Sequence, residues 1–254
     1  MKIMPLGLSD SLSGRGWGFP SFLLESDGRY ILVDCPADII QRLNGIGLNP
    51  LDISHVLITH HHDDHTAGLI SFLTAQKYLR LFFDTYASIG SVREGQVVHD
   101  LSVHYCGGDL RWYNHFKESL VIHHLSDVPL SLSIVMDGVS QLNLLDNSVT
   151  VDLRPTKHSA KCKALRFNDS IGISADTSFD PELIEWLNKA GIIFHECGMG
   201  GPHTKITELD TLPKDILDKV NIYHMPDIFI KAWHECPPLV ALSELRWYEG
   251  GKDF

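Results

Sequence analysis

The stretch His60-His61-His62-Asp63-Asp64-His65 directly follows the short apolar run His55-Val56-Leu57-Ile58-Thr59. Within it, His60, His62, Asp64 and His65 stand at spacings i, i+2, i+4 and i+5. Two imidazoles in a turn can bind one metal ion, while the carboxylate and the next imidazole bind a neighbouring ion. Two metal ions a few Å apart polarise a phosphoryl or carbonyl oxygen and generate hydroxide. The stretch therefore predicts a hydrolase with two divalent metal ions.

This stretch resembles the HxHxDH signature of the metallo-β-lactamase superfamily. The run Leu32-Val33-Asp34 is similar to the strand-end aspartate that supports the metal loop in that superfamily. The resemblance implies an α/β fold, the αββα four-layer sandwich, with further metal ligands on later loops.

Three later segments, each just after an apolar strand-like run, match those ligand-bearing loops. They are Thr156-Lys157-His158-Ser159, Ile173-Ser174-Ala175-Asp176-Thr177 and Ile222-Tyr223-His224. The resemblance implies that His60, His62 and His158 bind one metal ion and that Asp64, His65 and His224 bind the other. It implies that Asp176 bridges the two ions. Zinc is the first expectation for both, with manganese as the alternative, because the two metals share these ligands.

The segment from His158 to Trp186 is similar to the RNase Z-type phosphodiesterase branch of the superfamily. That branch includes tRNA 3′-end nucleases, a cyclic-phosphate phosphodiesterase of phosphonate metabolism and phage enzymes that destroy cyclic-nucleotide defence signals. Pro202-His203-Thr204 resembles the branch's extra histidine, which implies that His203 donates a proton to the leaving oxygen. His195-Glu196 resembles the branch's His-Glu pair, and we expect Glu196 or Asp34 to orient a ligand imidazole.

Composition and charge favour a small substrate. The net charge is −11, and no cluster of Lys and Arg forms the basic face that a long nucleic acid needs. The basic arm with which tRNA nucleases hold tRNA is also not found. No apolar run is long enough to cross a bilayer, and the odd number of five cysteines without a CxxC pair argues for a reducing, cytoplasmic setting. A homodimer is expected, because homodimers are common in this branch.

The order of predicted elements indicates one domain over residues 1–254. Apolar runs and turns predict a hairpin around Ser26-Asp27-Gly28 and another around Asn168-Asp169, and helical spacing predicts helices at 66–76 and 181–190. Residues at about 86–130 lack clear periodicity, so we expect an elaboration on the core there.

The hypothesis from the sequence is a dinuclear phosphodiesterase that hydrolyses a small cyclic nucleotide or cyclic phosphate. A metal-bound hydroxide attacks phosphorus, Asp64 helps to orient it, and His203 protonates the leaving oxygen. The alternatives are an RNase Z-type tRNA 3′-processing endonuclease, a lactone or thioester hydrolase on the same fold, and a scaffold that binds a nucleotide without hydrolysing it.

Overall fold

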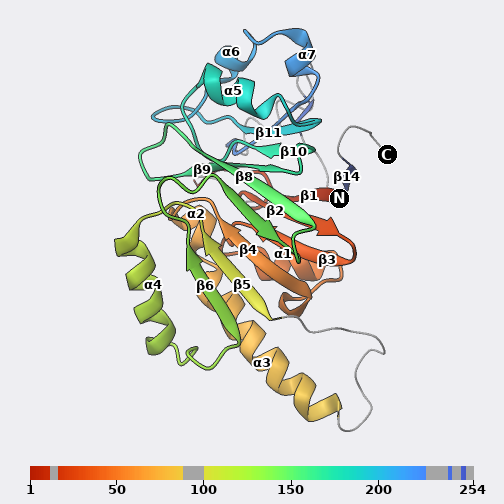
Figure 1. The fold of residues 1–254 in the computed structure, drawn as a ribbon, viewed down its shortest axis with the longest axis vertical. Helices are drawn as coiled ribbons and strands as arrows, with labels where there is room; N and C mark the ends of the chain where they lie inside the picture. Colours follow the sequence, from red (N-terminus) through yellow and green to blue (C-terminus); the bar gives the residue numbers. More distant parts are fainter. Residues whose placement is uncertain (12–16, 88–99, 227–239, 242–246, 250–254) are drawn as a thin grey trace.

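Two seven-stranded sheets form the centre of the computed structural model, which describes residues 1–11, 17–87, 100–226, 240–241 and 247–249 (Figure 1). In spatial order, the first sheet contains β14 (Tyr248–Glu249), β1 (Lys2–Gly7), β2 (Ser21–Ser26), β3 (Arg29–Val33), β4 (Ile53–Ile58), β5 (Leu101–Tyr105) and β6 (Leu130–Ile134). The second contains β13 (Val240–Ala241), β12 (Val220–Tyr223), β11 (Ile192–Glu196), β10 (Ile171–Ile173), β9 (Lys163–Phe167), β8 (Val149–Pro155) and β7 (Gln141–Leu144).

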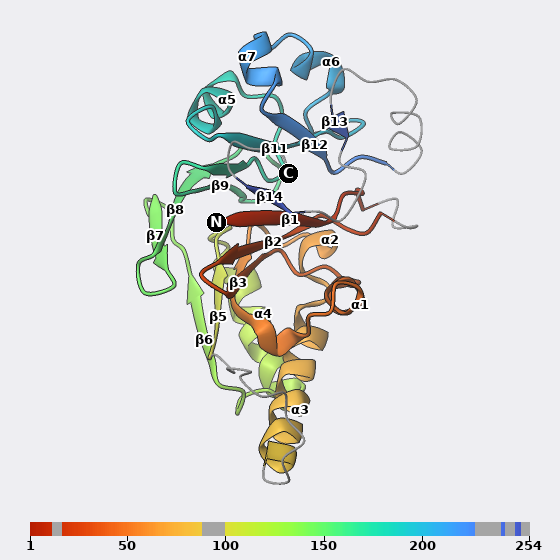
Figure 2. The same cartoon turned by 90° about the vertical axis from the view of Figure 1, so that its right-hand side faces the viewer.

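Helices cover the outer faces of both sheets. Those after strands of the first sheet are α1 (Ile39–Gly45), a 3₁₀ turn at Pro50–Asp52, α2 (Asp63–Thr66), α3 (Leu69–Ala87) and α4 (Leu110–Ile122). Those after strands of the second sheet are α5 (Pro181–Leu187), α6 (Ile206–Leu209) and α7 (Lys214–Leu217). Figure 2 shows α5, α6 and α7 above the second sheet and α1, α3 and α4 below the first, which confirms the predicted αββα sandwich.

Alternating side chains of the first sheet supply two separate cores. Leu24 and Ile31 point toward the second sheet and pack with residues such as Leu165, while their neighbours Leu23 and Leu32 pack beneath α1 and α3. Between the sheets, the ring of Phe22 lies 5.2 Å from that of Phe194 and 4.9 Å from that of Tyr223. Burial of the apolar side chains between the sheets holds the two sheets together, and burial of the opposite face holds the helices against the first sheet.

The strands end so that their following loops meet at one edge of the sandwich. β3 and β4 are parallel, as are β10, β11 and β12. Three residues at these ends have left-handed backbones, with φ of 61° at Asp34, 49° at Ala175 and 61° at His224. Such conformations are unfavourable outside glycine and persist where surrounding contacts impose them, often at functional sites.

The stretch at about 86–130, expected as an elaboration, contributes to both the sheet and the helix layer. Of it, residues 88–99 lie outside the described residues. β5 pairs in parallel between β4 and β6, and Phe116 of α4 packs into the core beneath that sheet. The sequence pattern that marks these elements is short. Buried and half-buried residues alternate over only five positions in β5, and the start of α4 is marked by the capping residue Asp109. In the part of the chain that the structure describes, no helix is long and apolar enough to cross a membrane.

Gly68 joins α2 to α3 at a point of close approach. Its N–H donates to the carbonyl of Cys35, and a Cβ built on it would lie 2.0 Å from the carbonyl oxygen of Pro36. We expect Gly68→Ala to lower the free energy of unfolding by about 1–3 kcal/mol, because the added methyl forces the backbone apart. Thermal unfolding of the metal-free protein measures this. Gly45→Ala is the control, since a methyl at that position would meet no other segment within 4 Å, and equal melting temperatures for the two variants would contradict the prediction.

Candidate metal centre

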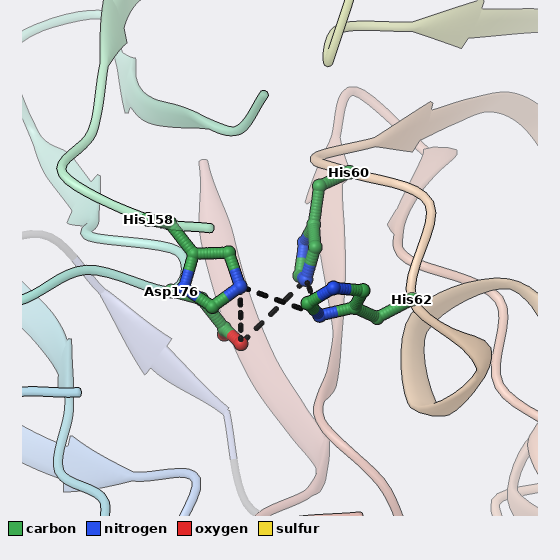
Figure 3. Close-up of side chains that lie close together, drawn as sticks. All are labelled: His60, His62, His158 and Asp176. Carbon is green, nitrogen blue, oxygen red and sulfur yellow. Dashed lines mark hydrogen bonds and ion pairs between the residues drawn. The ribbon is translucent and has the colours of Figure 1, made fainter. Parts of the chain in front are cut away.

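The loop after β4 and two loops of the second sheet bring the first predicted ligand group together. His60 Nε2 lies 3.0 Å from His62 Nδ1, and His158 Nε2 lies 3.3 Å from the same nitrogen. Asp176 Oδ2 lies 3.6 Å from His60 Nε2 and 3.9 Å from His158 Nε2. Figure 3 shows these side chains pointing toward one another, with His60 and His158 joined by dashed lines both to the Asp176 carboxylate and to His62. Three imidazoles and one carboxylate are a suitable donor set for a divalent transition metal.

The second predicted group lies beside the first. His224 Nε2 is 3.3 Å from Asp64 Oδ2, and His65 Nε2 is 3.7 Å from that oxygen. Asp176 also reaches this group, because its Oδ1 lies 3.5 Å from His65 Nε2 and its Oδ2 lies 3.5 Å from His224 Nε2. The structure thus brings all seven predicted ligands together, with Asp176 between the two groups.

Buried polar atoms without hydrogen bonds indicate that the site fits metal ions. Among the described residues, His65 Nε2 and Asp176 Oδ1 form no hydrogen bond, although both atoms are buried. A buried polar group without a partner is unfavourable by about 1–3 kcal/mol. Coordination of a cation satisfies both atoms, and the clustered donor set can bind divalent metal.

The charge of the metal-free site leads to the same conclusion. Burial would lower the pKa of His65, but the carboxylates of Asp176 and Asp34 outweigh it and raise that pKa to about 9. Burial would also lower the pKa of His224, which the Asp176 and Asp64 carboxylates raise to about 10. Both imidazoles are therefore protonated at neutral pH without metal. Since a metal ligand must be deprotonated, metal ions take over the positive charge that these protons supply.

A buried carboxylate behind the site orients the metal loop. Asp34 Oδ1 accepts the N–H of Thr59 at 2.8 Å, and the Thr59 hydroxyl donates to the same carboxylate. Asp34 Oδ2 lies 2.7 Å from His65 Nδ1, which leaves Nε2 of that ring toward the ligand group. Asp34 is therefore placed to orient the imidazole of His65, one of the predicted ligands. Thr59 was missed in the sequence, where only its position between the strand and the histidines indicates a role. Its hydroxyl also lies 3.1 Å from His60 Nδ1.

His203 lies at the edge of the cluster. Its ring stacks on that of His224, with centroids 5.0 Å apart, and its Nδ1 lies 3.3 Å from Glu196 Oε2. The Glu196 contact raises the pKa of His203. We expected Glu196 to orient a ligand imidazole. The histidine that it contacts is instead His203, the predicted proton donor. Asp176, His203 and His224 are also close enough to share one ion, so the geometry permits either a ligand or a proton donor at position 203.

Two cavities adjoin the ligand groups. One of about 500 Å³ is lined by Phe19, His61, His62 and Asp64, and one of about 320 Å³ is lined by Asp10, Met199, His203 and His224. Ser11 lines both. These volumes are in the range that small-molecule sites occupy.

The other histidines that the structure describes belong to none of the ligand groups. His61 Nδ1 lies 3.4 Å from the hydroxyl of Tyr105, and His55 stacks on His104 within the first sheet. Four cysteines are buried and unpaired in the described part of the chain. They are Cys35, Cys106, Cys162 and Cys197.

We expect Asp34→Asn to weaken metal binding about 10- to 100-fold, because the amide no longer holds the His65 imidazole as a carboxylate does. A chelator-competition titration with zinc measures the affinity. Asp146→Asn is the control, since Asp146 pairs with Arg29 at an exposed position. An unchanged affinity in Asp34→Asn would show that the His65 ring is held by other contacts.

Solved structures share this fold across nearly the whole chain. The short form of human tRNase Z superposes with a TM-score of 0.70 at 15% identity, covering 98% of this chain and 99% of that one. A diphosphatase of the PhnP family superposes with a TM-score of 0.71 at 16% identity, covering 98% of this chain and 97% of that one. At these identities, both likenesses show that the chain has the same fold as these enzymes.

Sequence comparison gives the family. The Anti-Pycsar protein Apyc1 of Paenibacillus harenae is 33% identical over 218 residues, which cover 81% of this chain and 82% of that protein. The family model described as Anti-Pycsar protein Apyc1 matches residues 1–234, which include every predicted ligand and His203. The chain therefore belongs to the Anti-Pycsar protein Apyc1 family, a metal-dependent hydrolase branch of the metallo-β-lactamase fold.

Proposed function

We propose that the chain is a phosphodiesterase that hydrolyses a small cyclic nucleotide with two bound divalent metal ions. The observation that carries this proposal is the position of Asp176, whose carboxylate lies between two histidine-rich ligand groups. Two further points support a cyclic nucleotide as the substrate. The chain belongs to the Anti-Pycsar family, and the branch that its motifs resemble includes enzymes that destroy cyclic-nucleotide signals.

The donor chemistry favours zinc at both positions. In our assignment His60, His62 and His158 hold the first ion, and Asp64, His65 and His224 hold the second, with Asp176 shared. Sites rich in imidazole suit zinc, with manganese as the alternative. Two such ions, when bound, polarise the phosphoryl oxygen and supply the hydroxide nucleophile at neutral pH.

The protein supplies orientation and a proton. Asp64 helps to orient the attacking oxygen, because its Oδ2 lies beside His65 and His224 and its side chain lines the cavity of about 500 Å³. His203 donates a proton to the leaving oxygen from Nε2, since Nδ1 faces Glu196. The stack of His203 on His224 places this donor beside the ligand groups.

The two cavities support a small substrate over a polynucleotide. Their linings include His62, Asp64 and His224 of the ligand groups, and the acidic side chains Asp10, Asp63 and Asp64 also line them. A long nucleic acid requires basic surface to neutralise its phosphates, whereas the net charge of this chain is −11. The homodimer and the cytoplasmic location stay predictions from the sequence, as does the single domain over residues 1–254.

A substrate panel tests the proposal. The zinc- or manganese-loaded protein is incubated with cyclic mono- and dinucleotides, bis-p-nitrophenyl phosphate and a precursor tRNA, with His62→Ala as the blank. Turnover of a cyclic nucleotide that is lost in the blank and on chelation is the expected result. Cleavage of precursor tRNA without any cyclic nucleotide would favour the tRNA nuclease. No cleavage of any diester by metal-loaded protein would favour an ester, lactone or thioester substrate.

We expect His203→Gln to lower kcat for the cyclic nucleotide by about 10²- to 10⁴-fold, which is the usual contribution of a positioned proton donor. Metal content, measured by elemental analysis, should remain at the wild-type value. Loss of one metal ion in this variant would instead identify His203 as a ligand.

A further inference from the structure

Gly198 lies directly against His203, two residues beyond the end of β11. A Cβ built on Gly198 would lie 2.6 Å from the Cβ of His203 and 2.7 Å from its Cγ. These atoms are the first two of the histidine side chain. Rotation of the imidazole ring about the Cβ–Cγ bond moves neither of them, so it does not relieve the overlap. Gly200 in the same loop differs, because a Cβ at that position would meet no other segment within 4 Å.

The His203 ring also lies beside two histidine rings and a carboxylate. Its centroid lies 5.0 Å from the ring of His224 and 5.4 Å from the ring of His158. Its Nδ1 lies 3.3 Å from Glu196 Oε2. A methyl group added at position 198 therefore displaces the His203 imidazole from its present position, toward the cavity of about 320 Å³ that it lines.

The carboxylate beneath the ring is fixed in place. Glu196 is fully buried, and its Oε1 accepts the N–H groups of Thr177 and Thr204, both at 3.0 Å. The loop is closed at its base, because the N–H of Gly198 donates to the carbonyl of Thr204 at 3.0 Å. Neither the carboxylate nor the loop ends can follow a displaced His203 without breaking these bonds.

We propose that Gly198 is a positioning residue for proton transfer, an inference that rests on the proposed role of His203. The missing side chain at position 198 allows His203 to pack beside the ligand groups with Nε2 toward the leaving oxygen. In the hydrolysis, water first loses a proton to solvent, from which His203 regains one at the end of the cycle. The oxygen of the resulting hydroxide bonds to phosphorus, the bond from phosphorus to the leaving oxygen breaks, and the His203 proton passes to that oxygen. Displacement of His203 impairs only the last of these events.

Leaving groups of different basicity test this role. A ribose alkoxide needs a proton as it leaves, whereas p-nitrophenolate is weakly basic and leaves without one. We expect Gly198→Ala to lower kcat for a cyclic mononucleotide by about 100-fold, as misplacement of a catalytic group by about 1 Å does. Its kcat for bis-p-nitrophenyl phosphate and its metal content should stay close to the wild-type values. An equal loss on both substrates, or no loss on either, would overturn the proposal.

An NMR measurement separates this inference from the proposed substrate. The imidazole signals of His203 in a long-range ¹⁵N–¹H spectrum of the zinc-loaded protein are assigned by their loss in His203→Gln. They should shift in Gly198→Ala and stay in place in Gly200→Ala. Unmoved signals in Gly198→Ala would overturn the positioning role whatever the substrate. A shift in a protein whose wild type cleaves no cyclic nucleotide would support the positioning role and reject the proposed substrate.

Discussion

The rest of the site depends on the contacts of one buried carboxylate, that of Asp34, which lies behind the loop of His60 to His65. Asp34 accepts hydrogen bonds from the N–H and the hydroxyl of Thr59, and it contacts His65 Nδ1. One side chain therefore fixes both the end of β4 and the ring of His65, a predicted ligand. Asp34 itself has a left-handed backbone at the end of β3. Such a conformation persists only when surrounding contacts compensate for it, and here the compensation comes from hydrogen bonds that form the site.

Glu196 has the corresponding role on the second sheet. One oxygen accepts two backbone N–H groups, which hold the loops of Asp176 and His203, and the other oxygen faces His203. Each sheet thus ends in one buried carboxylate that orients a histidine. The two carboxylates serve different groups, since Asp34 contacts a predicted ligand and Glu196 contacts the predicted proton donor. Rigid support of this kind keeps the reacting groups within a few tenths of an Å of their working positions.

Much of this arrangement could be predicted from the sequence, because each predicted ligand lies in a segment that follows a strand and the motif spacing is specific. The hairpin around Asn168-Asp169 forms between β9 and β10 as predicted. The helix predicted at 66–76 instead begins at Leu69 and continues to Ala87, past the end of its clear apolar face. The partner of Glu196 could not be predicted, because the closure of the loop at Thr204 depends on contacts between segments that local patterns do not reveal.

The order of the strands has a consequence for how the chain folds. β1 to β6 of the first sheet come from residues 2–134, and β7 to β12 of the second come from residues 141–223. Each half can therefore assemble from contacts within its own stretch of chain, and contacts that are close in sequence form fastest. The predicted ligands are divided between the halves, so the two predicted ligand groups come together only after the halves have docked. Metal binding at these residues would then follow docking, so it would favour correctly joined halves and stabilise their association.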